Sequence, residues 1–176
     1  AMGTNRLADR WLDALNPRTA NRPLVTGRIP VSTAWIGSGL ACLVLVLAAW
    51  ALGPLTLKLL PGAILFLIGY SFTKRFTWTT HFILGFTDGL APVGAWVAVR
   101  QSLFTPADLP AWILLGVVAF WIAGFDLIYA CQDVEFDKQY GVQAIPARFS
   151  VGFALSLSAI CHGITAGLLV WLGLMM

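Results

Sequence analysis

Long apolar runs dominate this chain and constrain its fold more than any other feature. A helix needs about 20 mostly apolar residues to cross a bilayer. Five runs of this kind are present, over approximately Thr33–Leu52, Leu55–Phe72, Thr79–Val99, Leu109–Gln132 and Phe149–Met175. In lipid, only helices and closed barrels satisfy the backbone hydrogen bonds. The runs lack the alternation of barrel strands, so the sequence predicts an all-α, multi-spanning transmembrane helical bundle.

The composition leads to the same conclusion. Only 11% of the residues are charged and 59% are hydrophobic, whereas a soluble domain carries about 25% charged residues. A polar segment, Asn5–Leu15, precedes the first run and is typical of the polar end of a helix. We expect residues 1–176 to form one transmembrane domain that is truncated at both ends. The sequence gives no indication of oligomeric state.

The basic residues of the loops lie mainly on one side of the predicted bundle. Lys58 and Arg100 belong to the loops opposite the end of Asn5–Leu15. The loops on the same side as that end carry Arg18, Arg22, Arg28, Lys74, Arg75, Lys138 and Arg148. Cytoplasmic loops are enriched in Lys and Arg, so we expect this side to face the cytoplasm. These residues form no basic helix or stripe, which argues against nucleic-acid binding.

Most of the eight acidic residues form two patches at that same side. In the first patch, Asn5, Asp9 and Asp13 are spaced by four residues, which places them on one helix face. The second patch runs from Asp126 to Asp137. Its acids Asp126, Asp133 and Asp137 follow at spacings of seven and four, with Tyr129 and Gln132 on or beside the same face.

Stacked carboxylates repel each other, and near a membrane they also pay a desolvation cost. Two such ladders on one face indicate that cations bind between them. Ligand sets made only of oxygen favour Mg²⁺, which bridges carboxylates to substrate phosphates. Basic residues of nearby loops are natural partners for the remaining phosphate oxygens, and they are Arg18, Arg22, Lys74 and Arg75.

Other interpretations of the charged residues stay open. The acids could be solvated helix ends paired with Arg6, Arg10 and Lys138. Asp88 lies within a predicted span, where it could line a cavity or be paired structurally. We expect His81 to be a residue of the membrane interface.

The two motifs resemble those of the UbiA family of intramembrane prenyltransferases. That family carries Asn-x3-Asp-x3-Asp near the end of one helix and Asp-x3-Asp near the end of another, which correspond here to Asn5/Asp9/Asp13 and Asp133/Asp137. The flanking sequences are similar too, in Asn16-Pro-Arg-Thr-Ala-Asn-Arg22-Pro, Tyr70-Ser-Phe-Thr-Lys74-Arg75-Phe-Thr and Tyr129-Ala-Cys-Gln132-Asp133. The resemblance covers the whole chain and implies that it is a fragment of a nine-helix UbiA-type fold.

The resemblance also implies an activity. It is the Mg²⁺-dependent transfer of a polyprenyl group from polyprenyl diphosphate to an aromatic acceptor, 4-hydroxybenzoate before others, in ubiquinone- or menaquinone-type quinone biosynthesis. A hydroxynaphthoate acceptor stays open, as does a membrane transporter that binds cations. The enzyme would lie in the bacterial inner membrane with its site facing the cytoplasm.

The residues then take the following expected roles. Asp9, Asp13, Asp133 and Asp137 hold the metal and are catalytic, as is Tyr129, whose ring would shield an allylic cation. The residues expected to bind substrate are Asn5, Arg18, Arg22, Tyr70, Lys74, Arg75, Asp126 and Gln132.

Overall fold

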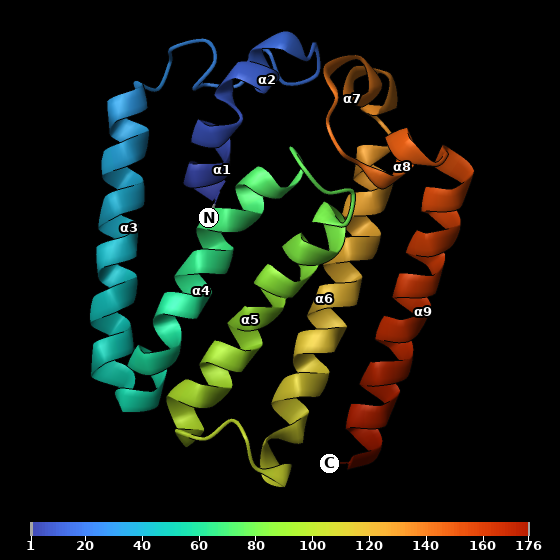
Figure 1. Ribbon diagram of the computed structural model, residues 1–176. Coiled ribbons are helices and arrows are strands. Elements are labelled where there is room, and N and C mark those ends of the chain that lie inside the picture. The colour runs from blue at the N-terminus through green and yellow to red at the C-terminus, as the bar shows by residue number, and fades with distance from the viewer. Residues whose placement is uncertain (1, 176) are drawn as a thin grey trace.

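Five long helices lie side by side in the computed structural model, which describes residues 2–175 (Figure 1). They are α3 (Val31–Leu52), α4 (Pro54–Thr73), α5 (Thr80–Arg100), α6 (Leu109–Ala130) and α9 (Val151–Met175). Each is long and apolar enough to cross a membrane, α6 together with the short turn before it. The predicted helical bundle is confirmed, and the expected span ends differ from the observed helix ends by no more than two residues.

Short elements gather at one end of the bundle, at the top of Figure 1. They are α1 (Met2–Ala8), α2 (Arg10–Leu15), α7 (Val134–Tyr140) and α8 (Ile145–Arg148), and a single 3-10 turn, η1 (Pro106–Asp108), lies at the other end. Helix α1 packs against α3 and α4. Both predicted acidic patches therefore lie at the same end of the bundle.

The helix of the first motif is interrupted only locally. It breaks at Asp9, which separates α1 from α2. Hydrogen bonds from the Asp9 N–H to the Asn5 carbonyl (2.9 Å) and from the Asp13 N–H to the Asp9 carbonyl (2.8 Å) continue the helical pattern across the break. The predicted stacking of Asn5, Asp9 and Asp13 on one helical path therefore holds.

The second motif is not on one continuous helix, as its spacing had implied. Helix α6 ends at Ala130, the chain turns over residues 131–133, and α7 begins at Val134 with Asp133 as its N-cap residue. The Asp133 carboxylate accepts hydrogen bonds from Arg18 and Asn16, which belong to the loop after α2. Only Asp133 and Asp137 share a helical turn, joined by a hydrogen bond from the Asp137 N–H to the Asp133 carbonyl (2.7 Å).

Small residues bring α5, α6 and α9 into close contact. A Cβ atom on Gly85 would lie 2.1 Å from the carbonyl oxygen of Ala119, and one on Gly89 would lie 2.8 Å from that of Leu115. Between α6 and α9, the Ser158 hydroxyl donates to the Gly124 carbonyl (2.7 Å). This is the small-residue packing by which membrane helices approach each other closely. It fixes α5 and α6, whose side chains line the cavity described below, against each other and against α9.

The acid at the opposite end of the bundle is structural. Asp108 is fully buried and accepts hydrogen bonds from the Trp96 indole (2.9 Å), the Ser102 hydroxyl (2.6 Å) and the N–H and hydroxyl of Thr105 (2.9 and 2.7 Å). These contacts close the turn between α5 and α6. Because its oxygens are so fully engaged, Asp108 has no role in a metal site.

We predict that Gly85→Ala weakens the bundle. The added methyl group would meet backbone atoms of α6, so the helices must separate, at a cost of about 1–3 kcal/mol. Thermal unfolding of the purified protein in detergent measures this. Gly94→Ala, in the same helix but with nothing within 4 Å of the added atom, is the control and should match or exceed the wild-type stability, because Ala favours helix over Gly. Equal melting temperatures for the two variants would contradict the packing account.

Candidate active site

A cavity of about 580 Å³ opens where the short helices meet the ends of α4, α5 and α6. It brings together residues from distant parts of the chain, including both acidic motifs. Of the thirteen predicted site residues, all but Arg75 and Gln132 line it, and these are Asn5, Asp9, Asp13, Arg18, Arg22, Tyr70, Lys74, Asp126, Tyr129, Asp133 and Asp137.

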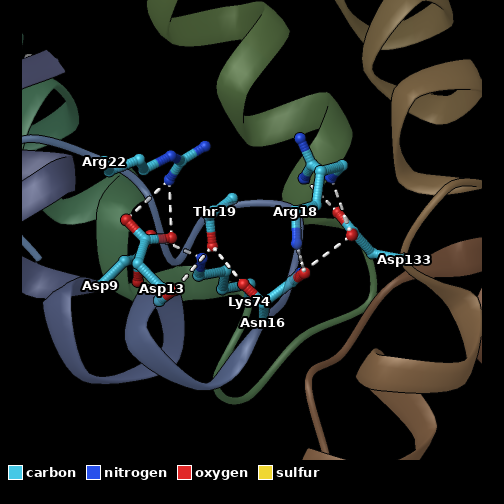
Figure 2. A network of polar contacts seen from close by, with 8 residues as sticks. All are labelled: Asp9, Asp13, Asn16, Arg18, Thr19, Arg22, Lys74 and Asp133. Atoms are coloured by element: carbon cyan, nitrogen blue, oxygen red, sulfur yellow. Dashed lines mark hydrogen bonds and ion pairs between the residues drawn. The ribbon is translucent and has the colours of Figure 1, made fainter.

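Both acids of the first motif are buried and paired with cations from elsewhere in the chain (Figure 2). The Lys74 ammonium, just beyond the end of α4, donates to Asp9 Oδ2 at 2.5 Å. One Arg22 nitrogen, Nη1, lies 2.6 Å from both oxygens of Asp13. The Thr19 hydroxyl donates to the Asp13 carbonyl at 2.9 Å. The loop after α2 is thereby folded back over the motif.

Asp133 of the second motif is held by that same loop (Figure 2). Arg18 binds it with two nitrogens, Nε to Oδ1 at 2.9 Å and Nη2 to Oδ2. Asn16, which is itself buried, donates from Nδ2 to Asp133 Oδ1 at 2.9 Å and accepts the Arg18 N–H at 2.9 Å. The Arg18 guanidinium also lies over the ring of Tyr129, 5.0 Å from its centre. The two motifs are thus joined through one short loop.

The carboxylates differ in how strongly they hold their charge. Burial raises the pKa of Asp137 to about 7, and the charge of Asp133 adds to this effect. Burial likewise raises the pKa of Asp9, although the Lys74 ammonium opposes it. Burial would also favour the neutral form of Asp133, but hydrogen bonds from Arg18 and Asn16 outweigh it and lower the pKa of that carboxyl.

A divalent cation fits this set of side chains. Asp9 Oδ1 is buried and has no hydrogen-bond partner, and an unpaired buried carboxylate oxygen is costly unless a cation joins it. All donors are oxygen atoms, as Mg²⁺ prefers. Within residues 2–175, no three Asp, Glu, His or Cys side chains converge to hold a metal by themselves. A metal ion here would complete its shell with water or phosphate oxygens, as Mg²⁺ usually does.

The deeper wall of the cavity is mostly apolar. Leu84, Ile122 and Phe125 line it, and two carboxylates, Asp88 and Asp126, are set among them. Asp88 also borders a second, largely apolar cavity of about 750 Å³ between α3, α4, α5 and α6. Of the two roles left open for Asp88, the structure supports the lining of a cavity.

The remaining candidates lie outside the cavity. Arg75 is exposed and donates to the Ala8 carbonyl at 2.6 Å, which ties the end of α1 to the end of α4. Gln132 is exposed in the turn before α7, and Arg148 is exposed beside Phe149. In the described part of the chain, no ion pair joins the motif acids to Arg6, Arg10 or Lys138. The acids are therefore not merely helix ends paired within their own motifs.

Two residues of the site were not predicted from the sequence. Asn16 was noted only for its place in the flanking sequence, yet it bridges the loop to Asp133. His81 was expected at the membrane interface and lies in the first turn of α5; its burial, its place in the cavity lining and its contact with Asp126 at 2.7 Å were not expected. A His within an apolar span usually has a polar partner. The separation of 45 residues between His81 and Asp126 in the sequence gives no indication that Asp126 is that partner.

Comparison with known protein families identifies the family of this chain. The model of the UbiA prenyltransferase family matches residues 1–176. The chain belongs to the UbiA prenyltransferase family. Among curated UbiA relatives, it is 31% identical over 159 residues to the 4-hydroxybenzoate octaprenyltransferase of Neisseria gonorrhoeae, covering 90% of this chain and 52% of that one. It is 33% identical over 177 residues to the 4-hydroxybenzoate solanesyltransferase of Synechocystis, covering 98% and 57%.

A solved UbiA structure supports the fold directly. The apo structure of a UbiA homologue from Aeropyrum pernix matches with a TM-score of 0.85 and 32% identity, over 95% of this chain and 62% of that chain. The present chain therefore spans about half to three fifths of the length of the UbiA proteins that it matches.

We predict that Asn16→Ala destabilises the metal-free protein. The change removes a half-buried hydrogen bond to a carboxylate, and a hydrogen bond to a charged group contributes about 1.5–3 kcal/mol. Thermal unfolding in detergent with EDTA measures the loss. Asn21→Ala provides the matched control, because Asn21 is exposed in the same loop and should unfold like the wild type. The bridging role of Asn16 is refuted if the two variants melt together.

Proposed function

We propose that the protein transfers a polyprenyl group from polyprenyl diphosphate to an aromatic acceptor in an Mg²⁺-dependent reaction. One observation carries the proposal: two acidic motifs and the cations Arg18, Arg22 and Lys74 converge on a single cavity at one end of a membrane helical bundle. Carboxylates for metal ions and cations for phosphate oxygens are the groups that a metal diphosphate requires.

The ion pairs of the cavity support an exchange of partners on binding. Arg18, Arg22 and Lys74 now neutralise Asp133, Asp13 and Asp9. With Asp9, Asp13 and Asp133 holding Mg²⁺, the same three cations would be free to bind the diphosphate. Asp9, Asp13 and Asp133 would each have a cationic partner in both states, so none of these three carboxylates would be left as a buried charge alone.

The residues of this chain would then have the following roles in the reaction. Asp9, Asp13, Asp133 and Asp137 would hold Mg²⁺, which when bound supplies a Lewis acid that stabilises the leaving diphosphate. Arg18, Arg22 and Lys74 would neutralise the diphosphate as the allylic C–O bond breaks. The rings of Tyr70 and Tyr129 face the cavity and would shield the allylic cation. The isoprenoid tail would lie along apolar surfaces of the spans.

The names of relatives support 4-hydroxybenzoate as the acceptor, because both curated relatives described above act on it. At about 31–33% identity the acceptor can differ, so a hydroxynaphthoate is the second candidate. The transporter hypothesis is disfavoured, since transporters place their binding groups near the bilayer midplane. The motif acids belong to α2, α7 and their N-cap positions, and both helices lie at one end of the bundle (Figure 1). The product would enter quinone biosynthesis.

We also propose that the cavity faces the cytoplasm from the inner membrane of a bacterium. The support is the excess of Lys and Arg in the loops at the cavity end. Five membrane-length helices and bacterial relatives are consistent with this location.

The test offers the full-length protein one polyprenyl diphosphate together with 4-hydroxybenzoate and a hydroxynaphthoate, and identifies products by mass spectrometry. We expect prenylated 4-hydroxybenzoate, formed with Mg²⁺ and not with EDTA. Asp9→Asn and Asp133→Asn should each lower the rate about 10²-fold or more, because each removes a metal ligand.

Glu135→Gln is the matched control for these variants. Glu135 is an exposed acid on α7 that does not line the cavity, so its rate should stay at the wild-type value. Product formation that survives both EDTA and the two Asp variants would refute the metal-diphosphate site. Prenylation of neither acceptor would refute the proposed acceptors, while donor turnover to free diphosphate would still support the donor site.

A further inference from the structure

His81 and Asp126 form a pair on the deeper wall of the cavity that the diphosphate site does not use. His81 is in the first turn of α5, and its side chain is 3% exposed. Its Nδ1 atom lies 2.7 Å from Asp126 Oδ2, near the end of α6. Asp126 is partly open to the cavity, with its side chain 31% exposed. The pair thus joins a buried imidazole to an accessible carboxylate.

The backbone determines which imidazole nitrogen carries the proton. The Ile145 N–H donates to His81 Nε2 at 3.3 Å in a buried position. A backbone N–H can only donate, so Nε2 must accept and cannot carry a hydrogen. The proton of neutral His81 is therefore on Nδ1 and is donated to Asp126. This contact holds one oxygen of Asp126 and leaves the other free.

We propose that His81 is a positioning residue that, as the Nδ1–H tautomer, orients Asp126 toward the hydroxyl group and ring carbon of the aromatic acceptor. This inference rests on the proposed prenyl transfer and assigns the acceptor side of the same cavity. Asp126 would accept the proton that the acceptor loses.

The surroundings of Asp126 suit an aromatic ring and not a diphosphate. Leu84, Ile122 and Phe125 share the deeper wall with it, and Phe125 stacks on Tyr129 with ring centres 5.9 Å apart. The cavity cations Arg18, Arg22 and Lys74 pair with other acids. A free carboxylate oxygen beside apolar walls repels phosphate but accepts a hydrogen bond from a phenol.

Four other carboxylates of the cavity are less suited to the acceptor. Asp9, Asp13 and Asp133 are engaged by cations at the mouth of the cavity. Asp88 lines the deeper wall, but no side chain of the described residues holds it by a hydrogen bond or ion pair. A proton acceptor works best when it is held in place, and Asp126 is held by His81.

The chemical step balances without any further reactant. The allylic C–O bond breaks and its electron pair leaves with the diphosphate. The ring carbon beside the acceptor hydroxyl forms the new C–C bond with the allylic carbon. The proton on that ring carbon passes to Asp126, which restores the aromatic ring. The net exchange is prenyl diphosphate and arene for prenylated arene and protonated diphosphate, once Asp126 returns the proton.

Substitutions of His81 separate its two hydrogen bonds. Asn places an amide N–H near the position of Nδ1 and can keep the bond to Asp126. Gln reaches the position of Nε2 and can keep the bond from Ile145, and Phe keeps the ring shape but neither bond. We expect His81→Asn to retain most of kcat, while His81→Gln and His81→Phe lose about tenfold or more. The KM for polyprenyl diphosphate should not change.

A double-mutant cycle with Asp126 tests whether His81 acts through it. Asp126→Asn should lower kcat about 10²-fold or more, as expected for the loss of a general base, with Mg²⁺-dependent binding of inorganic diphosphate intact. In that background, His81→Phe should cost less than about twofold. An equal cost of His81→Phe in both backgrounds, or wild-type kcat in His81→Phe, would overturn the proposal.

A measurement independent of turnover separates this inference from the proposed function. Nitrogen-15 NMR of histidine-labelled protein in lipid should show a neutral Nδ1–H imidazole, assigned as the signal that His81→Asn removes. A neutral Nε2–H tautomer would overturn the inference even in an active enzyme. If the wild type prenylates no acceptor while the Nδ1–H signal is present, the proposed function fails and the positioning of Asp126 stands.

Discussion

Three ion pairs at one end of the bundle are the interaction on which the rest of the site depends. A buried carboxylate without a partner is expensive, and here Asp9, Asp13 and Asp133 each pair with a cation from outside their own motif. To form these pairs, the loop after α2 must fold back over α7, and the end of α4 must lie against the first motif. The charges to which we assign the binding of Mg²⁺ and diphosphate are therefore also the contacts that build the site. The proposed Mg²⁺ diphosphate would replace both partners of each pair.

Much of the fold could be predicted because a bilayer leaves few choices. The five apolar runs became α3, α4, α5, α6 and α9 with ends close to those expected, since only helices satisfy the backbone in lipid. The sequence also indicated that most basic loop residues lie at one end of the bundle. The break between α6 and α7 could not be predicted, because the spacing of Asp126, Asp133 and Asp137 fits an unbroken helix equally well. It depends on Arg18 and Asn16, which hold Asp133 from more than a hundred residues away.

The candidate site, like the fold, could be predicted from the sequence only in part. Residue type and spacing predicted the acids and the cations Arg18, Arg22 and Lys74, because chemistry demands those groups in any metal-diphosphate site. They did not separate Arg75, which binds a backbone carbonyl, from Lys74, its neighbour in the chain. They also did not identify His81, whose meaning comes from two contacts, with Asp126 and with the Ile145 N–H. The polar and the apolar parts of the cavity, to which we assign the diphosphate and the aromatic ring, can be told apart only in three dimensions.

Binding of inorganic diphosphate to the full-length protein, measured by equilibrium dialysis with Mg²⁺ and again with EDTA, tests the exchange of ion-pair partners most directly. If Mg²⁺ must take the carboxylates before the cations are free, diphosphate should bind about tenfold or more tightly with Mg²⁺, the size of a typical coupling between two ligands. The gain should disappear in Asp133→Asn and persist in Glu135→Gln. Equal diphosphate affinity with Mg²⁺ and with EDTA would contradict the account.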